Sequence, residues 1–315
     1  MAQAACPSAL QPEHIHRIHS LCRAFNLQSS DTNNRAKWGA PKPKAKPRPC
    51  PSTLTRYTPR AYGRSRKLET RASDVCFVSY PKSGTTWLSY IIVLITGNAG
   101  KSLQDSHYWV ESNWTSESKV PLEETQGPRM LKSHMPYNMA LGGDPAKNAC
   151  KYIYIARNPK DVCSSYYHFE SNKSWTGYYD GGWDHWLQMF VDGKAHRDDW
   201  FDHVLSWWEH RDAENILFLT YEYLKRDMAG QLRKVAQFLS ATLDDAKFEE
   251  IEHKVSFSEM KKTDFSAPKS KEMGKFFRKG EIGSWKEYFT VAQNERFGQL
   301  YKAKMGSSGL TFTFE

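Results

Sequence analysis

Four short apolar runs, each followed by a turn or a helix start, limit the possible folds of this chain more than any other feature. The runs lie at residues 74–80 (DVCFVSY), 129–134 (RMLKSH), 151–157 (KYIYIAR) and 215–221 (NILFLTY). Short apolar strands that alternate with helices are typical of parallel strands joined by crossover helices. The sequence therefore predicts an α/β fold, with a central parallel sheet and helices on both faces. Ligands of such sheets bind at the carboxyl ends of the strands.

The positive charge of the chain is concentrated at its N-terminal end. The formal net charge is +9, yet residues 1–73 hold 14 Lys and Arg against three acids, whereas residues 74–315 hold 30 basic and 32 acidic residues. Residues 1–73 are also rich in proline and have little to bury. We therefore predict a largely disordered basic leader at 1–73 and one folded domain at 74–315. Because that domain is slightly acidic, we expect no nucleic-acid partner for it.

The cysteines indicate a reducing compartment. The six cysteines include no C-x-x-C pair, and Cys76 and Cys150 fall in or beside strand-like runs. No apolar run is long enough to cross a bilayer. We expect a cytoplasmic protein without a membrane partner.

A short amphipathic pattern in the leader leaves a second localisation open. Apolar residues recur there with helical spacing, at Ile15, Ile18, Cys22 and Phe25. The pattern fits a solvated tail or a small docking helix. It also fits an organelle transit peptide, since such peptides are amphipathic, rich in arginine and poor in acids.

A strand-loop-helix that could bind a phosphate follows the first run. Its sequence, PKSGTTW at residues 81–87, combines a lysine, a glycine and several hydroxyl side chains at the start of a helix. Free N–H groups and the helix dipole favour an anion there. The order differs from the G-x-x-x-x-G-K-[ST] loop of nucleoside triphosphatases. The alternative is an ordinary turn capped by Thr85.

The other strand ends carry cations and a histidine. Arg157 ends the third run, where a nucleotide triphosphatase would place an aspartate for magnesium, so metal-assisted γ-phosphoryl transfer is disfavoured. Lys132 and His134 end the second run, and a histidine is suited to proton abstraction near neutral pH. Arg278 and Lys279 precede Gly280 in a turn-rich loop. Taken singly, each has a structural alternative: a salt bridge, a core histidine or a solvated basic loop.

Taken together, four ordered motifs resemble the cytosolic sulfotransferase family. They are YPKSGTTW, LKSHMP, ARNPKDVCSSYYHF and FRKGEIGSWKEYFT, within residues 71–300. The resemblance implies transfer of a sulfuryl group from 3′-phosphoadenosine 5′-phosphosulfate to a hydroxyl or amine of a small-molecule acceptor, with no metal. The anion of the loop would then be the 5′-phosphosulfate.

The family pattern also implies a role for each matching residue. His134 would be the general base, with Lys132 beside it at the sulfuryl group and Lys82 at the departing bridging oxygen. The remaining donor-binding residues would be Ser83, Gly84, Thr85, Thr86, Trp87, Arg157, Ser165, Tyr221, Phe257, Arg278, Lys279 and Gly280. A homodimer is implied by the K-x-x-x-T-V-x-x-x-E motif, matched by Lys286, Thr290, Val291 and Glu295.

Two departures from the family pattern and the identity of the acceptor stay open at this stage. Val255 stands where many members have a threonine that binds adenine, and Ser284 replaces the usual aspartate of G-x-x-G-D-W-K. The acceptor is not identified, because the candidate aromatic wall residues fit a pocket or the core equally well; these are Tyr108, Trp109, Trp114, Tyr178 and Tyr179. The alternatives to a sulfotransferase are a kinase-like enzyme and a non-catalytic nucleotide-binding module.

Overall fold

The computed structural model describes residues 66–97, 107–111, 122, 124–172, 179–195, 197–263 and 278–315. Most of the predicted leader lies outside these ranges. Within them, residues 66–288 and 310–315 belong to one compact unit, which holds every candidate donor and catalytic residue. No helix of the described ranges is both long and apolar enough to cross a membrane.

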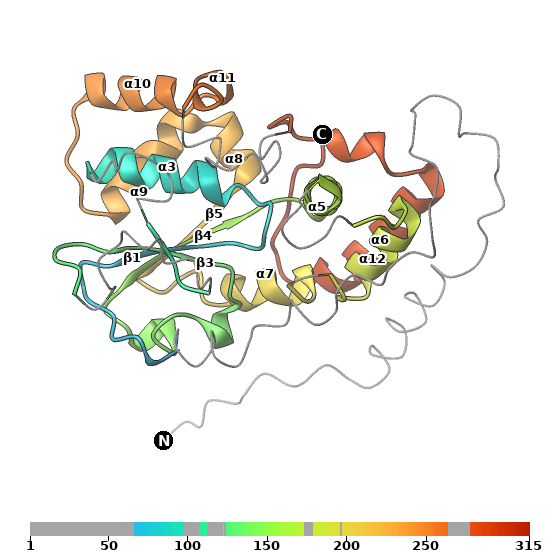
Figure 1. The fold of residues 1–315 in the computed structure, drawn as a ribbon, viewed down its shortest axis with the longest axis horizontal. Coiled ribbons are helices and arrows are strands. Elements are labelled where there is room, and N and C mark those ends of the chain that lie inside the picture. The colour runs from blue at the N-terminus through green and yellow to red at the C-terminus, as the bar shows by residue number, and fades with distance from the viewer. Residues whose placement is uncertain are drawn as a thin grey trace. The chain divides into compact units, whose positions relative to one another are not determined.

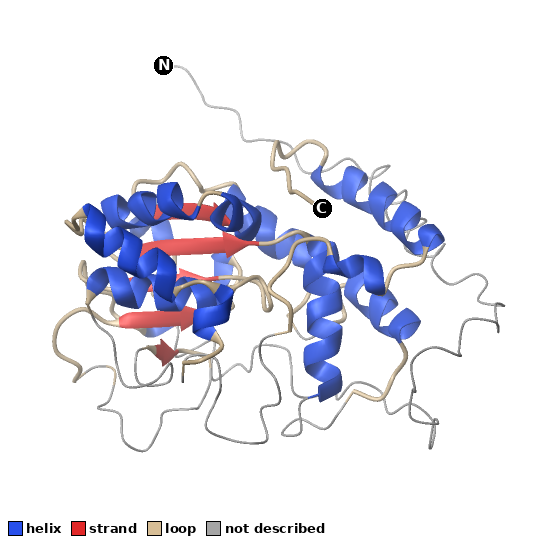
Figure 2. Ribbon diagram, turned by 90° about the horizontal axis from the view of Figure 1, so that it is seen from above, coloured by secondary structure: helices blue, strands red, loops and turns tan. Residues whose placement is uncertain are grey.

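The centre of this unit is a parallel sheet of five strands in the order β2-β3-β1-β4-β5. The strands are β1 (Val75–Val78), β2 (Tyr108–Trp109), β3 (Met130–Ser133), β4 (Lys151–Ala156) and β5 (Ile216–Thr220). Every neighbouring pair is parallel, so all the carboxyl ends meet at one edge, as Figures 1 and 2 show. The predicted fold class and the four predicted strands are confirmed. The sequence reading missed β2, a two-residue edge strand.

One face of the sheet is covered by α3 (Thr85–Thr96), α8 (Tyr221–Arg226), α9 (Met228–Phe238) and α10 (Asp245–Lys254) (Figure 1). Alternate strand side chains, such as Phe77, Ile153 and Ile155, enter this core and are fully buried. Burying an aliphatic or aromatic side chain contributes roughly 1.5–3 kcal/mol. This layer therefore holds β1 and α3, which flank the phosphate loop, in a fixed relation.

The opposite face packs on α7 (Trp200–Trp208). The Tyr154 ring stacks on Trp207 with centroids 5.4 Å apart, and the Trp207 indole N–H donates to the Met135 carbonyl at 3.1 Å. Between β3 and β4 the chain forms only the short 3-10 turns η1 (Tyr137–Met139) and η2 (Pro145–Lys147). Because both faces of the sheet are covered, the strands are largely apolar, with polar side chains such as Lys132 and Ser133 near the carboxyl edge.

Four further elements complete the unit: α5 (Pro159–Asn172), α6 (Trp183–Val191), α11 (Phe257–Met260) and η4 (Ser284–Glu287). Asn158 begins α5 by accepting from the Asp161 N–H at 2.9 Å, and Pro159 is its first residue, an arrangement typical of helix starts. The buried cysteines Cys76, Cys150 and Cys163 are free thiols.

The last helix, α12 (Val291–Met305), lies in a separate compact unit whose described part is Phe289–Gly309. It begins with a capping box between Thr290 and Gln293. Val291 is an exposed apolar residue of this helix, with 76% of its surface accessible. Three of the four residues of the predicted dimer motif lie at the start of α12; they are Thr290, Val291 and Glu295.

Candidate active site

The phosphate loop, residues 81–84, joins β1 to α3 at the carboxyl edge of the sheet. Lys82 and Gly84 both have left-handed backbone, with φ of 71° and 103°. Left-handed backbone at a residue other than glycine costs roughly 1–3 kcal/mol and clusters at ligand sites. A Cβ on Gly84 would come 2.9 Å from Tyr221 Cδ2, so only glycine fits there. Gly84 is the N-cap of α3 without a side-chain cap, which leaves the first N–H groups of the helix for an anion.

The hydroxyl side chains in and beside this loop fall into two groups. Ser79 and Thr85 are hydrogen-bonded to each other through their hydroxyls. Ser83 is fully buried, and its Oγ has no hydrogen-bond partner among the described residues. A buried hydroxyl without a partner costs about 1–3 kcal/mol, which a bound anion would recover.

Tyr221, directly after β5, is the centre of a cluster of candidate donor-binding residues. The Tyr221 ring lies 5.2 Å from the Trp87 ring and 4.3 Å from the Arg157 guanidinium. The Trp87 indole N–H donates to the Val255 carbonyl at 2.8 Å. Val255 therefore holds the Trp87 ring through its backbone carbonyl, a contact that does not depend on its side chain.

A second set of contacts brings Phe257 and residues 278–281 to the same place. A Cβ on Gly280 would overlap the Phe257 ring. Arg157 Nη2 donates to the Glu281 carbonyl at 2.7 Å, while the buried Arg157 Nε has no partner among the described residues. Residues predicted from three separate strand ends and one distant loop thus lie together.

Arg278 is held in place from its own loop. Its guanidinium donates to Ser284 Oγ at 2.5 Å and to Glu287 Oε2 at 3.0 Å, and Lys279 also forms an ion pair with Glu287. Burial, Arg278 and Lys82 all lower the pKa of His168 on α5, so both cations lie near that ring. Lys82 Nζ is 4.2 Å from the Phe169 ring, and the half-buried Ser165 lies in the same helix.

Asp161 ties this loop to α5. Its fully buried carboxylate accepts from the Trp285 N–H at 2.9 Å, the Gly283 N–H at 3.0 Å and Ser284 Oγ at 3.1 Å. It also accepts from Asn158 Nδ2 at 2.9 Å and lies 3.3 Å from Arg157 Nη2. Ser284, one of the two departures from the family pattern, therefore connects Asp161 to Arg278. Asp161 is not among the site residues predicted from the sequence.

His134 follows β3 and is buried with 6% exposure. Its Nδ1 lies 2.8 Å from the Ser79 carbonyl, which can only accept, so Nδ1 carries the proton and Nε2 of the neutral ring is the basic atom. Burial, followed by the charges of Lys132 and Arg197, holds the pKa of His134 well below its usual range. The imidazole is therefore neutral at pH 7.

Lys132, two residues earlier, is buried with 8% exposure, and its Nζ lies 4.3 Å from the Trp109 ring. Burial lowers the pKa of Lys132 to about 8, although Glu111 opposes this shift. Lys132 is thus still largely cationic at neutral pH.

Three groups around this pair were not found from the sequence: Glu111, Arg197 and His203. His203 Nε2 lies 3.1 Å from the His134 carbonyl and donates to it, while His203 Nδ1 accepts from the Tyr154 hydroxyl at 2.9 Å. Arg197 acts on His134 and Lys132 through its charge. None of the three follows a predicted strand, so the strand-end rule could not identify them.

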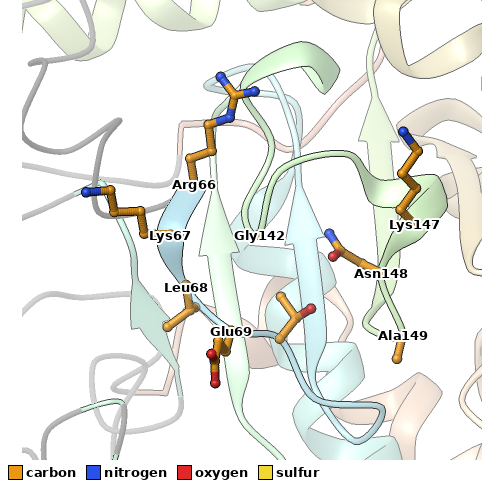
Figure 3. Close-up of a pocket in the computed structure, with 9 residues that line it drawn as sticks. Arg66, Lys67, Leu68, Glu69, Gly142, Lys147, Asn148 and Ala149 are labelled. Atoms are coloured by element: carbon orange, nitrogen blue, oxygen red, sulfur yellow. The ribbon is translucent and has the colours of Figure 1, made fainter.

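A separate hollow of about 500 Å³ lies away from these residues (Figure 3). It is lined by residues 66–70, Gly142 and residues 147–149, which precede β1 and β4. It therefore lies toward the amino ends of the strands and contains none of the candidate residues. Nor do the described residues include a group of three or more His, Cys, Asp or Glu placed to hold a metal ion.

The known proteins that this chain resembles include sulfotransferases, by sequence and by structure. The sulfotransferase domain model matches residues 72–309. Mouse sulfotransferase 1B1 is 37% identical over 274 residues, with 79% of this chain and 88% of the mouse protein covered. Rabbit amine sulfotransferase is 33% identical over 266 residues, covering 78% and 85%. The crystal structure of mouse sulfotransferase SULT7A1 complexed with PAP has a TM-score of 0.69 at 32% identity, covering 80% and 90%.

The chain therefore belongs to the sulfotransferase family, and its reaction is sulfuryl transfer. The family predicted from the four motifs is confirmed, and nothing in the comparisons supports the kinase-like alternative. A structure of retinol dehydratase, 20% identical with a TM-score of 0.66, shares the fold.

Proposed function

We propose that the sulfuryl donor is 3′-phosphoadenosine 5′-phosphosulfate. Supporting this are the arrangement around Tyr221 and the product-like PAP bound by mouse SULT7A1. The buried Ser83 Oγ and Arg157 Nε have no partner among the described residues and are suited to phosphate oxygens. These groups support a donor that has two anionic ends and a purine.

Each end of the donor has its own residues. The 5′-phosphosulfate would lie on Lys82, Ser83 and the N–H groups that begin α3. The adenine would lie between Trp87 and Phe257, within reach of Tyr221. The 3′-phosphate would be held by Arg157, Ser165 and the loop of Arg278, Lys279 and Gly280, because guanidinium groups bind phosphate in a two-pronged fashion.

The chemistry then falls to His134, Lys132 and Lys82. His134 Nε2 would take the proton of the acceptor hydroxyl or amine, since Nδ1 is committed to the Ser79 carbonyl. The ammonium of Lys132 would stabilise negative charge on the sulfuryl oxygens, and that of Lys82 charge on the leaving oxygen. The donor supplies the sulfuryl group.

We further propose a small-molecule acceptor, a cytoplasmic location and a homodimer formed through Lys286 and the start of α12. The acceptor class follows from the family and from a buried base suited to one hydroxyl or amine. The exposed Val291 is consistent with an interface at the predicted dimer motif. Sedimentation of the purified protein and of Val291→Glu tests the dimer.

Two variants test the donor assignment. Lys82→Ala should mainly reduce kcat, because Lys82 faces the transferring group, whereas Arg278→Ala should mainly raise the donor KM, because it holds a remote phosphate. Each lost contact to a phosphate costs on the order of 1.5–3 kcal/mol. Titration with 3′-phosphoadenosine 5′-phosphate and steady-state kinetics measure both effects. Equal effects on kcat alone, with unchanged nucleotide affinity, would contradict the assignment.

The metal-independent mechanism has its own test. We expect activity to persist after treatment with a chelator, because the cationic groups named above supply the charge that magnesium supplies in phosphoryl transfer. A strict requirement for magnesium in the transfer assay would contradict it.

A further inference from the structure

Glu111, which was not predicted from the sequence, forms several hydrogen bonds beside His134 and Lys132. Glu111 Oε1 accepts from the His134 backbone N–H at 2.6 Å and from Ser133 Oγ at 2.5 Å. Glu111 Oε2 accepts from the Trp109 indole N–H at 2.7 Å. One half-buried carboxylate therefore accepts hydrogen bonds from β2, through Trp109, and from the end of β3, through Ser133 and His134.

Trp109 extends this contact to the two catalytic side chains. In the register of the sheet Trp109 pairs with Lys132, and its ring lies 4.3 Å from Lys132 Nζ. The same ring meets the His134 imidazole edge to face at 5.7 Å. The edge strand β2 thus presents an aromatic wall to both groups, and Glu111 fixes the orientation of that wall.

We propose that Glu111 is a positioning residue that holds Lys132 and His134 in their working arrangement. It acts on His134 through the backbone and on Lys132 through Trp109 and through its own negative charge. This inference rests on the proposed roles of Lys132 and His134. Charge-assisted hydrogen bonds of this length are about twice as strong as neutral ones, so a carboxylate is suited to the task.

The charge of Glu111 has a separate consequence from its geometry. Burial lowers the pKa of Lys132 most, Glu111 opposes this shift and the charge of Arg197 adds to it. Burial also lowers the pKa of His134, and the charges of Lys132 and Arg197 lower it further. Removal of the Glu111 charge leaves burial and Arg197 unopposed, so Lys132 would lose its proton at a lower pH.

Two substitutions alter charge and geometry in different ways. Glu111→Gln retains an oxygen for His134 and Ser133 but loses the charge, and its NH2 group cannot accept from the Trp109 indole N–H. Glu111→Asp retains the charge but is one methylene too short to reach all three donors. Glu252→Gln, at an exposed position of α10, is the matched control. The readout is the pH dependence of kcat/KM for the donor, which reports the pKa values of the free enzyme.

We expect Glu111→Gln to move the alkaline limb of that profile about 0.5–1 pH unit lower, the size of shift that a nearby charge produces. Glu111→Asp should leave the limb in place and lower kcat roughly 10- to 100-fold, since small displacements of catalytic groups cost that much. Nucleotide affinity should stay within about 2-fold in both, and Glu252→Gln should match the wild type, as expected for a surface change.

Three outcomes decide the matter. An unchanged limb in Glu111→Gln, with His134→Ala inactive, would overturn the role of Glu111 while leaving the proposed function standing. Equal loss of kcat and of nucleotide affinity in both variants would indicate a merely structural role and would also overturn it. A fully active His134→Ala would instead show that the proposed function itself is wrong.

Discussion

At the residue scale, His134 and Lys132 are two buried basic groups that the same environment prepares for different tasks. Burial lowers the pKa of both, but from very different starting values. The histidine becomes reliably neutral and can accept a proton, while the lysine keeps most of its charge near pH 7. A base and a cation can therefore work side by side because their pKa values lie on opposite sides of neutrality.

This pair predicts the pH dependence of the enzyme. Because the pKa of His134 lies well below its usual range, the base stays neutral and kcat/KM for the donor should not fall between pH 7 and about 6. Because the pKa of Lys132 is about 8, kcat/KM should fall above about pH 8 as its ammonium is lost. A pH series of initial rates measures this. A profile that rises steadily to pH 10 would contradict it.

Sequence reasoning located side chains that follow predicted strands or lie in a family motif, and missed Glu111, Arg197 and His203, which do neither. Lys132, His134 and Arg157 were found because the carboxyl ends of parallel strands meet at one edge. Glu111 was missed because it follows a strand of only two residues, too short to show periodicity. Asp161 was missed because its bonds to residues 283–285 depend on tertiary contacts that no local pattern encodes.

At the scale of elements, the start of α5 and the loop before η4 act as one unit through Asp161. Asp161→Asn would replace one acceptor oxygen by an NH2 group, which donates, and would turn it toward groups that also donate, leaving buried N–H groups unpaired. Breaking such a buried network costs about 3–5 kcal/mol. Because Arg157 and Arg278 both depend on this network, the donor KM should rise at least about 10-fold while kcat changes less.

Denaturant unfolding and donor kinetics of Asp161→Asn measure these two effects. Asp212→Asn is the matched control, since Asp212 forms only a surface ion pair, with its side chain 84% exposed. A donor KM within about 2-fold of wild type, in a variant whose stability has fallen, would separate the network from the 3′-phosphate site.

The strands and helices were more predictable than the connections between them. The four apolar strands and the cap of α5 follow local rules, and all are present. The turn η1 after β3 follows no such rule, because α7 fixes the backbone there: Ser206 Oγ accepts from the Tyr137 N–H at 3.1 Å. The His203 and Trp207 side chains donate to the carbonyls of His134 and Met135. Helix α7 thus shapes the segment that carries His134, the proposed base.

At the scale of the whole molecule, the leader is predicted to be dispensable for catalysis at the donor site. Its first described residues, 66–70, already belong to the domain, because Arg129 bonds both the Glu69 carbonyl at 2.8 Å and the buried Asp74 carboxylate. Lys82 is the first candidate donor-binding residue along the chain. A basic segment with few apolar groups gains little from ordering.

A protein that begins at residue 60 should therefore keep its thermal stability and its affinity for 3′-phosphoadenosine 5′-phosphate. Calorimetric melting and nucleotide titration compare it with the full chain. The truncation should stop before residue 66, because Thr70 and Leu68 contact the neighbourhood of Gly142. Loss of nucleotide binding in the truncated protein would contradict the prediction that residues 1–59 are dispensable for the donor site.

The most direct test of the whole account is sulfuryl transfer by the wild type and by His134→Ala. Purified protein is supplied with labelled 3′-phosphoadenosine 5′-phosphosulfate and a panel of phenols, steroid alcohols, aliphatic alcohols and amines. We predict transfer to at least one of these classes. In folded His134→Ala, turnover should fall by roughly 10²–10⁴ while donor affinity changes little. Near-normal turnover in that variant, with its fold shown intact, would contradict the account.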